Sequence, residues 1–545
     1  MLQETMRKCR VNTVSTEGTT YYVDSACGQD TNQGTAPESA WRSVSKISGQ
    51  YYAPGDKILL KAGSVWNGQQ LYPKGSGSAH APIIIDQYGA GPKPVINANA
   101  AHEAAVQLVN QEYWEINNLE ITNARDLTRP ADVGNHVGIL LMIENESRDF
   151  HHIYIANCHV HDVDGDPDFQ GADDKTTGGI CGRVRAERGQ TPGYFEDVRI
   201  ENNRIERVSR SGIFLFSSAH MYSSSREPKD FVRDFFTYIR PADDWHEEFY
   251  SRDLYIAGNT IDCAAGDGIV VTFTCGALVE HNTVTRSSDR STAACVGMWP
   301  CYANHVVFQY NEVAHITNAK DDGTAFDFDC GSRNVIYQYN YSHHNTGGWM
   351  LLMKNAPDAN LVARYNVSAF ESMGKTWDTA DNSLMHNNVF YRNECVRPEH
   401  CSSELIGFKT AYNNLFIECR NIGFWRKDND GIQDHNAYVN SSGNHGEAHA
   451  VTGDAELAGP LPADTIGDGF PACEAFKLSA GSPCRNAGIA IPDAGDRDFF
   501  GNQLRTGKPD IGAHDLGCQK ATTGGLPTGP GARSRPAPRT LPTWK

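Results

Sequence analysis

The 545-residue sequence contains no uninterrupted run of about 18 apolar residues, so it predicts no transmembrane helix. Its first twenty residues also lack the apolar run of a secretion signal. Basic residues are outnumbered, because 48 Lys and Arg stand against 66 Asp and Glu and leave a net charge of −18. A negative chain is repelled by nucleic acid and by anionic membranes, so neither is an expected partner.

Cysteine, in contrast, is plentiful. Fifteen cysteines are many for a cytosolic protein. The close pairs Cys395/Cys401 and Cys473/Cys484 predict disulfides of an exported chain, with buried free thiols as the alternative interpretation. We therefore expect a secreted, extracellular protein whose signal peptide is absent from this sequence.

A helical pattern is missing as well, and a strand-rich repeat takes its place. An asparagine recurs in steps of 23, 29, 29, 26, 22, 26 and 22 residues, at Asn259, Asn282, Asn311, Asn340, Asn366, Asn388, Asn414 and Asn436. A period in the twenties predicts an all-β fold, a right-handed parallel β-helix in which each coil contains three short strands. The asparagine is expected at a turn of each coil, with a left-handed backbone and hydrogen bonds to its equivalents above and below.

The repeat sets the expected organisation of the chain. Residues 1–19 read as an irregular leader, residues 20–518 as the β-helix domain, and residues 519–545 as a disordered Pro/Gly-rich tail. A short helix near the N-terminus, within residues 37–47, is expected to cap the coil stack. Residues 219–253 interrupt the repeat and are expected to form a long loop beside a binding groove. Such an elongated protein is expected to be a monomer.

Two aspartates in one strand are the strongest chemical signal. Phe326 and Phe328 alternate with Asp327 and Asp329, and strand side chains change face at every residue. Both phenylalanines should therefore enter the core while both carboxylates point outwards, about 6 to 7 Å apart at their Cα atoms. Paired carboxylates hydrolyse glycosidic bonds, and their mutual repulsion raises one pKa, as a general acid requires. A solvated strand face or a calcium ladder is the alternative interpretation.

Neighbouring coils complete the predicted site. Superposing glycine pairs places Leu352 beside Asp327 and Lys354 beside Asp329, so Lys354 is the third predicted catalytic residue. The same comparison sets Thr272 opposite Asp327. Candidate substrate-binding residues in these coils are Asp267, Asp322, Trp299, His343, His344, Trp349 and Arg426. An acidic run suggests a calcium site, with Asp164, Asp166 and Asp168 as ligands, although it fails the EF-hand pattern.

Three phrases carry a family resemblance: "YYVDSACGQDTNQGTAPESAW", "FDFDCGSRNVIYQYNYSHHNTGGW" and "DFFGNQLRTGKPDIGAHD". They resemble secreted β-helix proteins related to pectate lyases and polygalacturonases, and the middle phrase is most similar to β-helix glycoside hydrolases such as bacterial xylosidases and fucosidases. That resemblance implies a strand aspartate, matched by Asp327, and a second carboxylate one coil later. The second position falls near Leu352, so the partner must be Asp329 or an acid such as Glu371 or Asp378, unless the mechanism differs.

These observations lead to three functional hypotheses. The first is a secreted glycoside hydrolase acting on a polysaccharide or oligosaccharide, which needs no cofactor. The second is a polysaccharide lyase that cleaves a uronate-containing polymer by β-elimination, with Lys354 as base, further cations at Lys409 and Arg426, and Ca²⁺ near the acidic patch. The third is a carbohydrate-binding β-helix without catalytic activity.

Overall fold

The computed structural model describes most of the chain between residues 18 and 516. The described ranges are 18–125, 134–168, 175–186, 190–217, 250–317, 322–353, 355, 359–376, 380–393, 405–420, 422–424, 431–442 and 446–516. The predicted tail, almost all of the predicted leader and most of the loop predicted at 219–253 lie outside these residues. No helix in the described ranges is long and apolar enough to cross a membrane.

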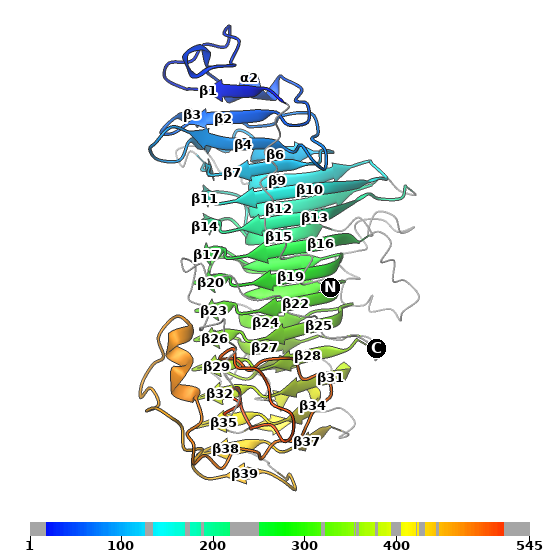
Figure 1. The fold of residues 1–545 in the computed structure, drawn as a ribbon, viewed down its shortest axis with the longest axis vertical. Helices are drawn as coiled ribbons and strands as arrows, with labels where there is room; N and C mark the ends of the chain where they lie inside the picture. Colours follow the sequence, from blue (N-terminus) through cyan, green and yellow to red (C-terminus); the bar gives the residue numbers. More distant parts are fainter. Residues whose placement is uncertain are drawn as a thin grey trace.

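Three long sheets of parallel strands make up the fold (Figure 1). The 14 strands of the first sheet are β1 (Thr20–Val23), β2 (Lys57–Lys61), β4 (Ile83–Tyr88), β7 (Trp114–Asn117), β10 (Asp149–Ala156), β13 (Tyr194–Glu201), β16 (Ser251–Ala257), β19 (Thr274–Glu280), β22 (Asn304–Gln309), β25 (Arg333–Gln338), β28 (Leu361–Arg364), β31 (Ala380–His386), β34 (Phe408–Tyr412) and β37 (Ile432–Asp434). The 14 strands of the second sheet are β3 (Val65–Asn67), β5 (Val95–Asn97), β8 (Glu120–Asn123), β11 (His159–Val163), β14 (Arg204–Val208), β17 (Thr260–Asp262), β20 (Thr283–Thr285), β23 (Glu312–Ala314), β26 (Tyr341–His343), β29 (Val367–Ala369), β32 (Val389–Tyr391), β35 (Leu415–Ile417), β38 (Ala437–Val439) and β39 (Val451–Thr452). The nine strands of the third sheet are β6 (Ala104–Val109), β9 (Val137–Glu144), β12 (Gly178–Arg185), β15 (Ser211–Ser217), β18 (Ile269–Thr272), β21 (Met298–Cys301), β24 (Thr324–Phe328), β27 (Gly348–Leu352) and β30 (Gly374–Thr376).

Each coil in the middle of the stack takes one strand from each long sheet, as β22, β23 and β24 illustrate, whereas the first and last coils have no strand in the third sheet. Every strand pairs in parallel with the equivalent strand of the next coil, so β22 pairs with β25 and β23 with β26. A separate pair, β33 (Leu405–Ile406) and β36 (Gly423–Phe424), continues the parallel pattern in the last coils. This topology is a parallel β-helix, as the repeat predicted.

The interior of the stack is a column of apolar side chains. Branched aliphatic residues repeat from coil to coil, as in Val279 of β19, and aromatic rings then replace them. Phe308 and Tyr337 stack at a centroid distance of 4.6 Å, and both are fully buried. β-branched and aromatic side chains suit this pleated, buried surface, and each coil is stabilised by the coils on either side of it.

The recurring asparagines form a buried hydrogen-bonded ladder between the first and second sheets. Asn311 donates from Nδ2 to the Oδ1 of Asn340, and the other predicted asparagines repeat this contact. The ladder begins one coil earlier than predicted, at Asn203, and its last asparagine bonds to Glu447. The predicted left-handed backbone belongs instead to the residue before each ladder asparagine, such as Tyr310 at φ 53°. The asparagine side chain is thereby free to turn inwards and bond along the stack.

Short helices occur near both ends of the described chain. The 3₁₀ helix η1 (Pro37–Ser39) lies within the segment where a helix was predicted, and α2 (Val44–Ser48) ends one residue beyond it. Ser43 caps α2 by accepting from the backbone N of Lys46. Near the other end, η4 (Phe470–Phe476) belongs to a C-terminal segment, residues 454–516, that packs on the last coils (Figure 1). Tyr341 of β26 donates to the carbonyl of Gly467 in this segment, at 2.9 Å.

One predicted disulfide is wrong. Cys473 and Cys484 are separate free thiols, both fully buried among apolar side chains of the C-terminal segment and the last coils. None of the eleven cysteines in the described ranges forms a disulfide, and eight of them are buried, so the buried-thiol interpretation holds for most of them. Cys395 and Cys401 lie outside the described residues.

Candidate active site

The predicted aspartate pair lies on the outer side of the third sheet, at β24. Phe326 and Phe328 are fully buried in the core, so Asp327 between them faces the other way. Asp329 follows directly after the strand. This alternation is the one that the sequence predicted, because a strand presents successive side chains to opposite faces.

The register of the neighbouring coils differs from the prediction. Met298 pairs with Phe326, which sets Trp299 beside Asp327, and Asp327 itself pairs with Leu351. Leu352 therefore faces the core, and Lys354 lies outside the described residues. The predicted pairing was one residue out because the glycine pairs that were superposed are not structurally equivalent.

The comparison with the earlier coil was also out of register, by two residues. Thr272 pairs with Cys301, so it falls in the column of Asp329 instead of the column of Asp327. A two-residue error keeps every side chain on its correct face, because the strand period is two. The predicted outward face was therefore right although the partners were wrong.

Asp327 and Asp329 are buried carboxylates that influence each other. Asp327 is 3% exposed, Asp329 is 8% exposed, and the Oδ1 of Asp327 has no hydrogen-bond partner among the described residues. Burial, together with the negative charges of Asp329 and Asp322, raises the pKa of Asp327 well above its usual value. Burial also raises the pKa of Asp329, but a 2.6 Å hydrogen bond from the Cys330 backbone N and the nearby charge of Lys175 oppose this shift.

Asp267 holds the predicted aromatic residue Trp299 in place. Its Oδ1 accepts from the Nε1 of Trp299 at 2.8 Å and from the backbone N of Val296 at 3.0 Å, and its Oδ2 lies 3.4 Å from the Nε of Arg210. Asp267 is fully buried and Trp299 is 4% exposed. The carboxylate of Asp267 thus bonds to groups inside the protein and holds Trp299 in place. It is not the sugar ligand that the sequence predicted.

Lys175 is a cation of this site that the sequence interpretation missed. Its Nζ lies 4.7 Å from the centre of the Trp299 ring and donates to the carbonyl of Ala294 at 3.3 Å. Burial acts to lower the pKa of Lys175, but the surrounding acidic groups, with Asp267 foremost, together outweigh burial and the pKa is raised. Lys175 directly follows the acidic run that was interpreted as a calcium loop. A single lysine after several aspartates was the feature of the sequence that could have indicated this cation.

We define the aspartate cluster as Asp267, Asp322, Asp327, Asp329, Lys175 and Trp299. Asp322, which is partly exposed, precedes β24 and forms a bridge with Cys295 of the preceding coil. Four of these side chains carry a negative charge when ionised and one carries a positive charge. The cluster can therefore hold a proton on one carboxyl group while a neighbouring carboxylate stays ionised, which is the requirement of glycosidic bond hydrolysis.

Other predicted site residues lie elsewhere. Trp349 is a core residue, 1% exposed, whose ring packs on Phe390 and Phe408, so it presents no surface to a sugar. His343 and His344 lie at the end of β26, on the second sheet, and not with the aspartate cluster on the third. Arg426, Lys354 and Asp378 lie outside the described residues, and Lys409 is on β34 of the first sheet.

Glu371, the other acid considered as a catalytic partner, is an internal residue. It is fully buried and accepts hydrogen bonds from Ser342, Ser368 and Asn345. These contacts direct its carboxylate into the coil stack, away from the outer face that bears Asp327. The structure therefore excludes Glu371 as the second carboxylate. The acids of the aspartate cluster remain, together with Asp378, which lies outside the described residues.

The three predicted calcium ligands do not gather their carboxylates at one point. Asp168 accepts hydrogen bonds from Ser291 and Thr292, Asp166 accepts from the backbone N of Asp168, and Asp164 accepts from the backbone N of Arg125. None of these three aspartates belongs to a group of three neighbouring ligand atoms within the described ranges. Within the described ranges these contacts fix loops onto the stack, and a calcium site at this acidic run stays a prediction.

The comparisons with known proteins agree with a carbohydrate-active β-helix. No family model matches the chain. It is 28% identical to a lacto-N-biosidase of Bifidobacterium longum subsp. longum over 92% of its own length, and spans about a third of that protein, 36%. The solved GH136 lacto-N-biosidase from Eubacterium ramulus matches with a TM-score of 0.58 and 26% identity, covering 70% of this chain and 66% of that one. XylC in complex with xylose shares the fold, with a TM-score of 0.52 at 12% identity over 92% of this chain and 99% of XylC. The chain is thus similar to lacto-N-biosidases in sequence and in structure.

Proposed function

We propose that this protein is a glycoside hydrolase whose catalytic groups belong to the aspartate cluster. The observation that carries the proposal is the buried pair Asp327 and Asp329, because their surroundings shift the two pKa values to different extents. The likeness to lacto-N-biosidases supports the same reaction class. A cofactor has no role in this proposal, since two carboxyl groups suffice for hydrolysis.

The surroundings of the two carboxyl groups assign their roles. Asp327 lacks a partner for its Oδ1 and has the more strongly raised pKa, so it keeps a proton and acts as the general acid. Asp329 accepts from the Cys330 backbone N and is stabilised by the charge of Lys175, so it is the carboxylate that ionises first. Asp322 is the more exposed neighbour and supplies a further contact for the substrate.

We propose a lacto-N-bioside as the substrate, following the two relatives named lacto-N-biosidase. A chromogenic aryl lacto-N-bioside tests this directly, with aryl glucosides and uronate-containing polysaccharides as comparison substrates. Release of the aryl group from the lacto-N-bioside alone supports the proposal. Ultraviolet absorbance of an unsaturated uronate would identify a lyase instead, and an absence of turnover on every substrate would favour a binding protein.

The residue roles are tested with Asp327→Asn and Asp329→Asn. Loss of a general acid or of its partner carboxylate should lower kcat by about 10²- to 10⁴-fold. Asp454→Asn, a change in the exposed part of the C-terminal segment, is the matched control and should keep full activity. Full activity in both cluster variants would remove the pair from the chemistry, and inactivity of Asp322→Asn alone would move the acid role to Asp322.

Four further properties complete the proposal: a right-handed coil, an N-terminal capping role for α2, a monomeric state and secretion. A right-handed crossover is the general rule for parallel strands, and the fully buried Val44 and Ile47 of α2 join the first core positions of the stack. Sedimentation velocity tests the monomer. Detection of the protein in cell-free culture medium tests secretion.

A further inference from the structure

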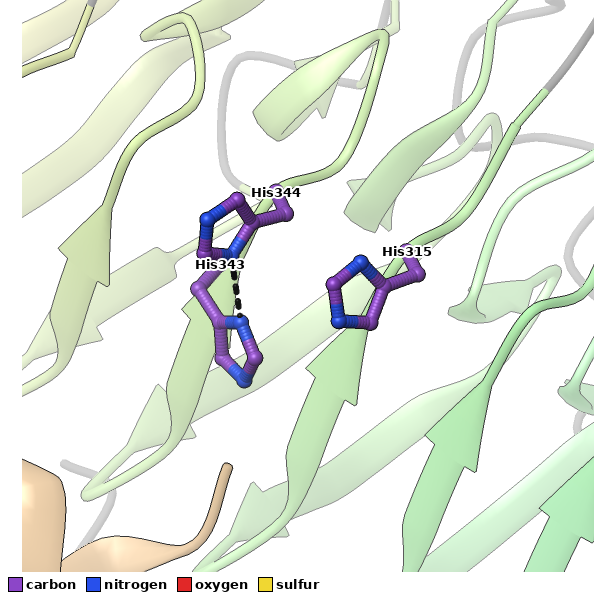
Figure 2. A group of neighbouring side chains, drawn as sticks. All are labelled: His315, His343 and His344. Atoms are coloured by element: carbon purple, nitrogen blue, oxygen red, sulfur yellow. Dashed lines mark hydrogen bonds between the residues drawn. The ribbon is translucent and has the colours of Figure 1, made fainter. Parts of the chain in front are cut away.

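Three histidines meet on the outer side of the second sheet (Figure 2), whereas the aspartate cluster lies on the third sheet. His315 follows β23, and His343 and His344 lie at the end of β26, one coil later. One ring nitrogen from each histidine lies within 4.8 Å of the other two. The backbone N of His315 donates to the carbonyl of His343. This hydrogen bond between neighbouring coils fixes the distance between the two backbones that carry the rings.

Two of these rings face each other through the same type of nitrogen. The Nδ1 atoms of His343 and His344 are 2.8 Å apart, so at most one of them carries a hydrogen in this arrangement. Neutral imidazoles with converging lone pairs are the form in which histidine binds transition metals.

Carboxylates occupy the positions that a metal site requires. The Nε2 of His343 lies 3.3 Å from Glu312, a contact that leaves its Nδ1 free of hydrogen and directed at His344. This is the carboxylate–histidine pairing that orients metal ligands in proteins. Asp468, from the C-terminal segment, places its Oδ1 3.7 Å from the Nε2 of His315, and its exposed side chain can approach further.

We propose that His315, His343, His344 and Asp468 form a binding site for Zn²⁺. Three imidazoles and one carboxylate supply the four ligands that a closed, structural zinc site uses. Tetrahedral coordination by nitrogen at about 2.0 to 2.1 Å requires only small movements of rings that already lie within 4.8 Å of one another. Glu312 is a positioning residue, because it bonds both His343 and the backbone N of Gly469, next to Asp468.

The position of the site gives the metal a structural role. It joins two successive coils to residues 464–469 of the C-terminal segment, where Thr465 contacts the Nε2 of His344. A bound Zn²⁺ would clamp this segment onto the stack, since the ion binds the folded arrangement and stabilises it. This role does not depend on the proposed hydrolase activity.

Calorimetric titration of chelator-treated full-length protein with Zn²⁺ tests the proposal, with Co²⁺ as a spectroscopic substitute. The wild type should bind one ion tightly and give the visible bands of tetrahedral Co²⁺. The double variant His315→Ala/His344→Ala should lose both signals. His102→Ala, a change at an exposed histidine outside the group, is the matched control and should keep them.

A milder variant covers the case in which the double variant fails to fold. Glu312→Gln keeps the shape of the side chain but weakens its contact to His343, and should lower zinc affinity about 10- to 100-fold. Zinc should also slow proteolytic cleavage near residues 464–469 in the wild type only. No zinc binding by the wild type, or unchanged binding in both the double variant and Glu312→Gln, would overturn the proposal, whatever the hydrolase assay gives.

Discussion

Replacing one asparagine in the middle of the ladder should destabilise the whole stack. Asn311 is fully buried and takes part in four side-chain hydrogen bonds. Its Oδ1 accepts from the backbone N and from the Nδ2 of Asn282, both at 3.0 Å. Its Nδ2 donates to the carbonyl of Val279 at 2.9 Å and to the Oδ1 of Asn340 at 3.1 Å. Asn311→Ala removes all four.

The size of the effect follows from the groups that lose a partner. The backbone N of Asn282 loses the acceptor that fixes it, and a buried unsatisfied group costs about 1 to 3 kcal/mol. The three other bonds contribute about 0.5 to 1.5 kcal/mol each. Allowing for the remaining partners of Asn282 and Asn340, the free energy of unfolding should fall by about 3 to 5 kcal/mol.

Chemical denaturation followed by tryptophan fluorescence measures this loss. Long stacks of repeats do not always unfold in one step, so wild type and variant are compared by the same transition. Asn67→Ala is the control, because it removes one exposed asparagine contact, at 3.2 Å from Asn97, and should change stability by less than about 0.5 kcal/mol. If Asn311→Ala cost less than about 1 kcal/mol, the reasoning on the ladder would be refuted.

Three other outcomes are expected. Trp349→Ala leaves a cavity in the core and should cost about 3 to 5 kcal/mol, measured by denaturation with the exposed Tyr51→Ala as control, and a loss below 1 kcal/mol would contradict the core placement. Burial raises the pKa of Asp498 from 3.8 to about 7, so its contribution to the free energy of unfolding is full below pH 3.8 and is lost as pH rises through 7. A series of melting temperatures measured across this pH range should therefore fall with pH in the wild type, and Asp498→Asn should remove that fall. The raised pKa of Asp327 keeps the proposed general acid protonated, so kcat should fall as pH rises through that pKa, and a rate that increases in this range would contradict the assignment.

The sequence predicted the architecture because the period of the asparagines is a direct consequence of stacking. Each ladder residue must bond to its equivalents, so the spacing of Asn282, Asn311 and Asn340 measures coil length. The ladder start was missed because the step from Asn203 to Asn259 spans a long insertion. The left-handed residues were misplaced by one, since Tyr310 and Tyr339 are residue types that rarely adopt that backbone.

The candidate site was predictable in its face and in part of its lining, including Trp299, but not in the register of the neighbouring coils. The alternation of Phe326, Asp327 and Phe328 fixes which side chains point outwards, because that depends only on the strand period. The lengths of the turns decide which residues of other coils lie beside Asp327. The positions of glycine pairs in the sequence do not reveal these lengths. Lys175 comes from a loop of a distant coil, and its contact with Trp299 is set by tertiary structure alone.

The histidine group also could not be predicted from the sequence, because tertiary structure brings its members together. His343 and His344 are adjacent in the sequence and were considered with the aspartates because they follow one coil later. The structure turns them onto another sheet, where His315 is brought to them by a 28-residue step along the stack. Asp468 arrives from more than 120 residues away, which no local pattern reveals.

The return of the C-terminal segment along the coils changes how this solenoid gains its cooperativity. In a simple stack each coil contacts only its neighbours, so unfolding can spread coil by coil from an end. Here Tyr339 donates to the carbonyl of Arg497, and Asn413 donates to that of Ile489, so the one C-terminal segment is bonded to coils that lie well apart in the stack. The part of the stack from β25 to β38, about a third of its coils, should therefore melt as one block. Its folding must also wait until the last part of the chain has been synthesised, whereas the coils before it can form as they emerge.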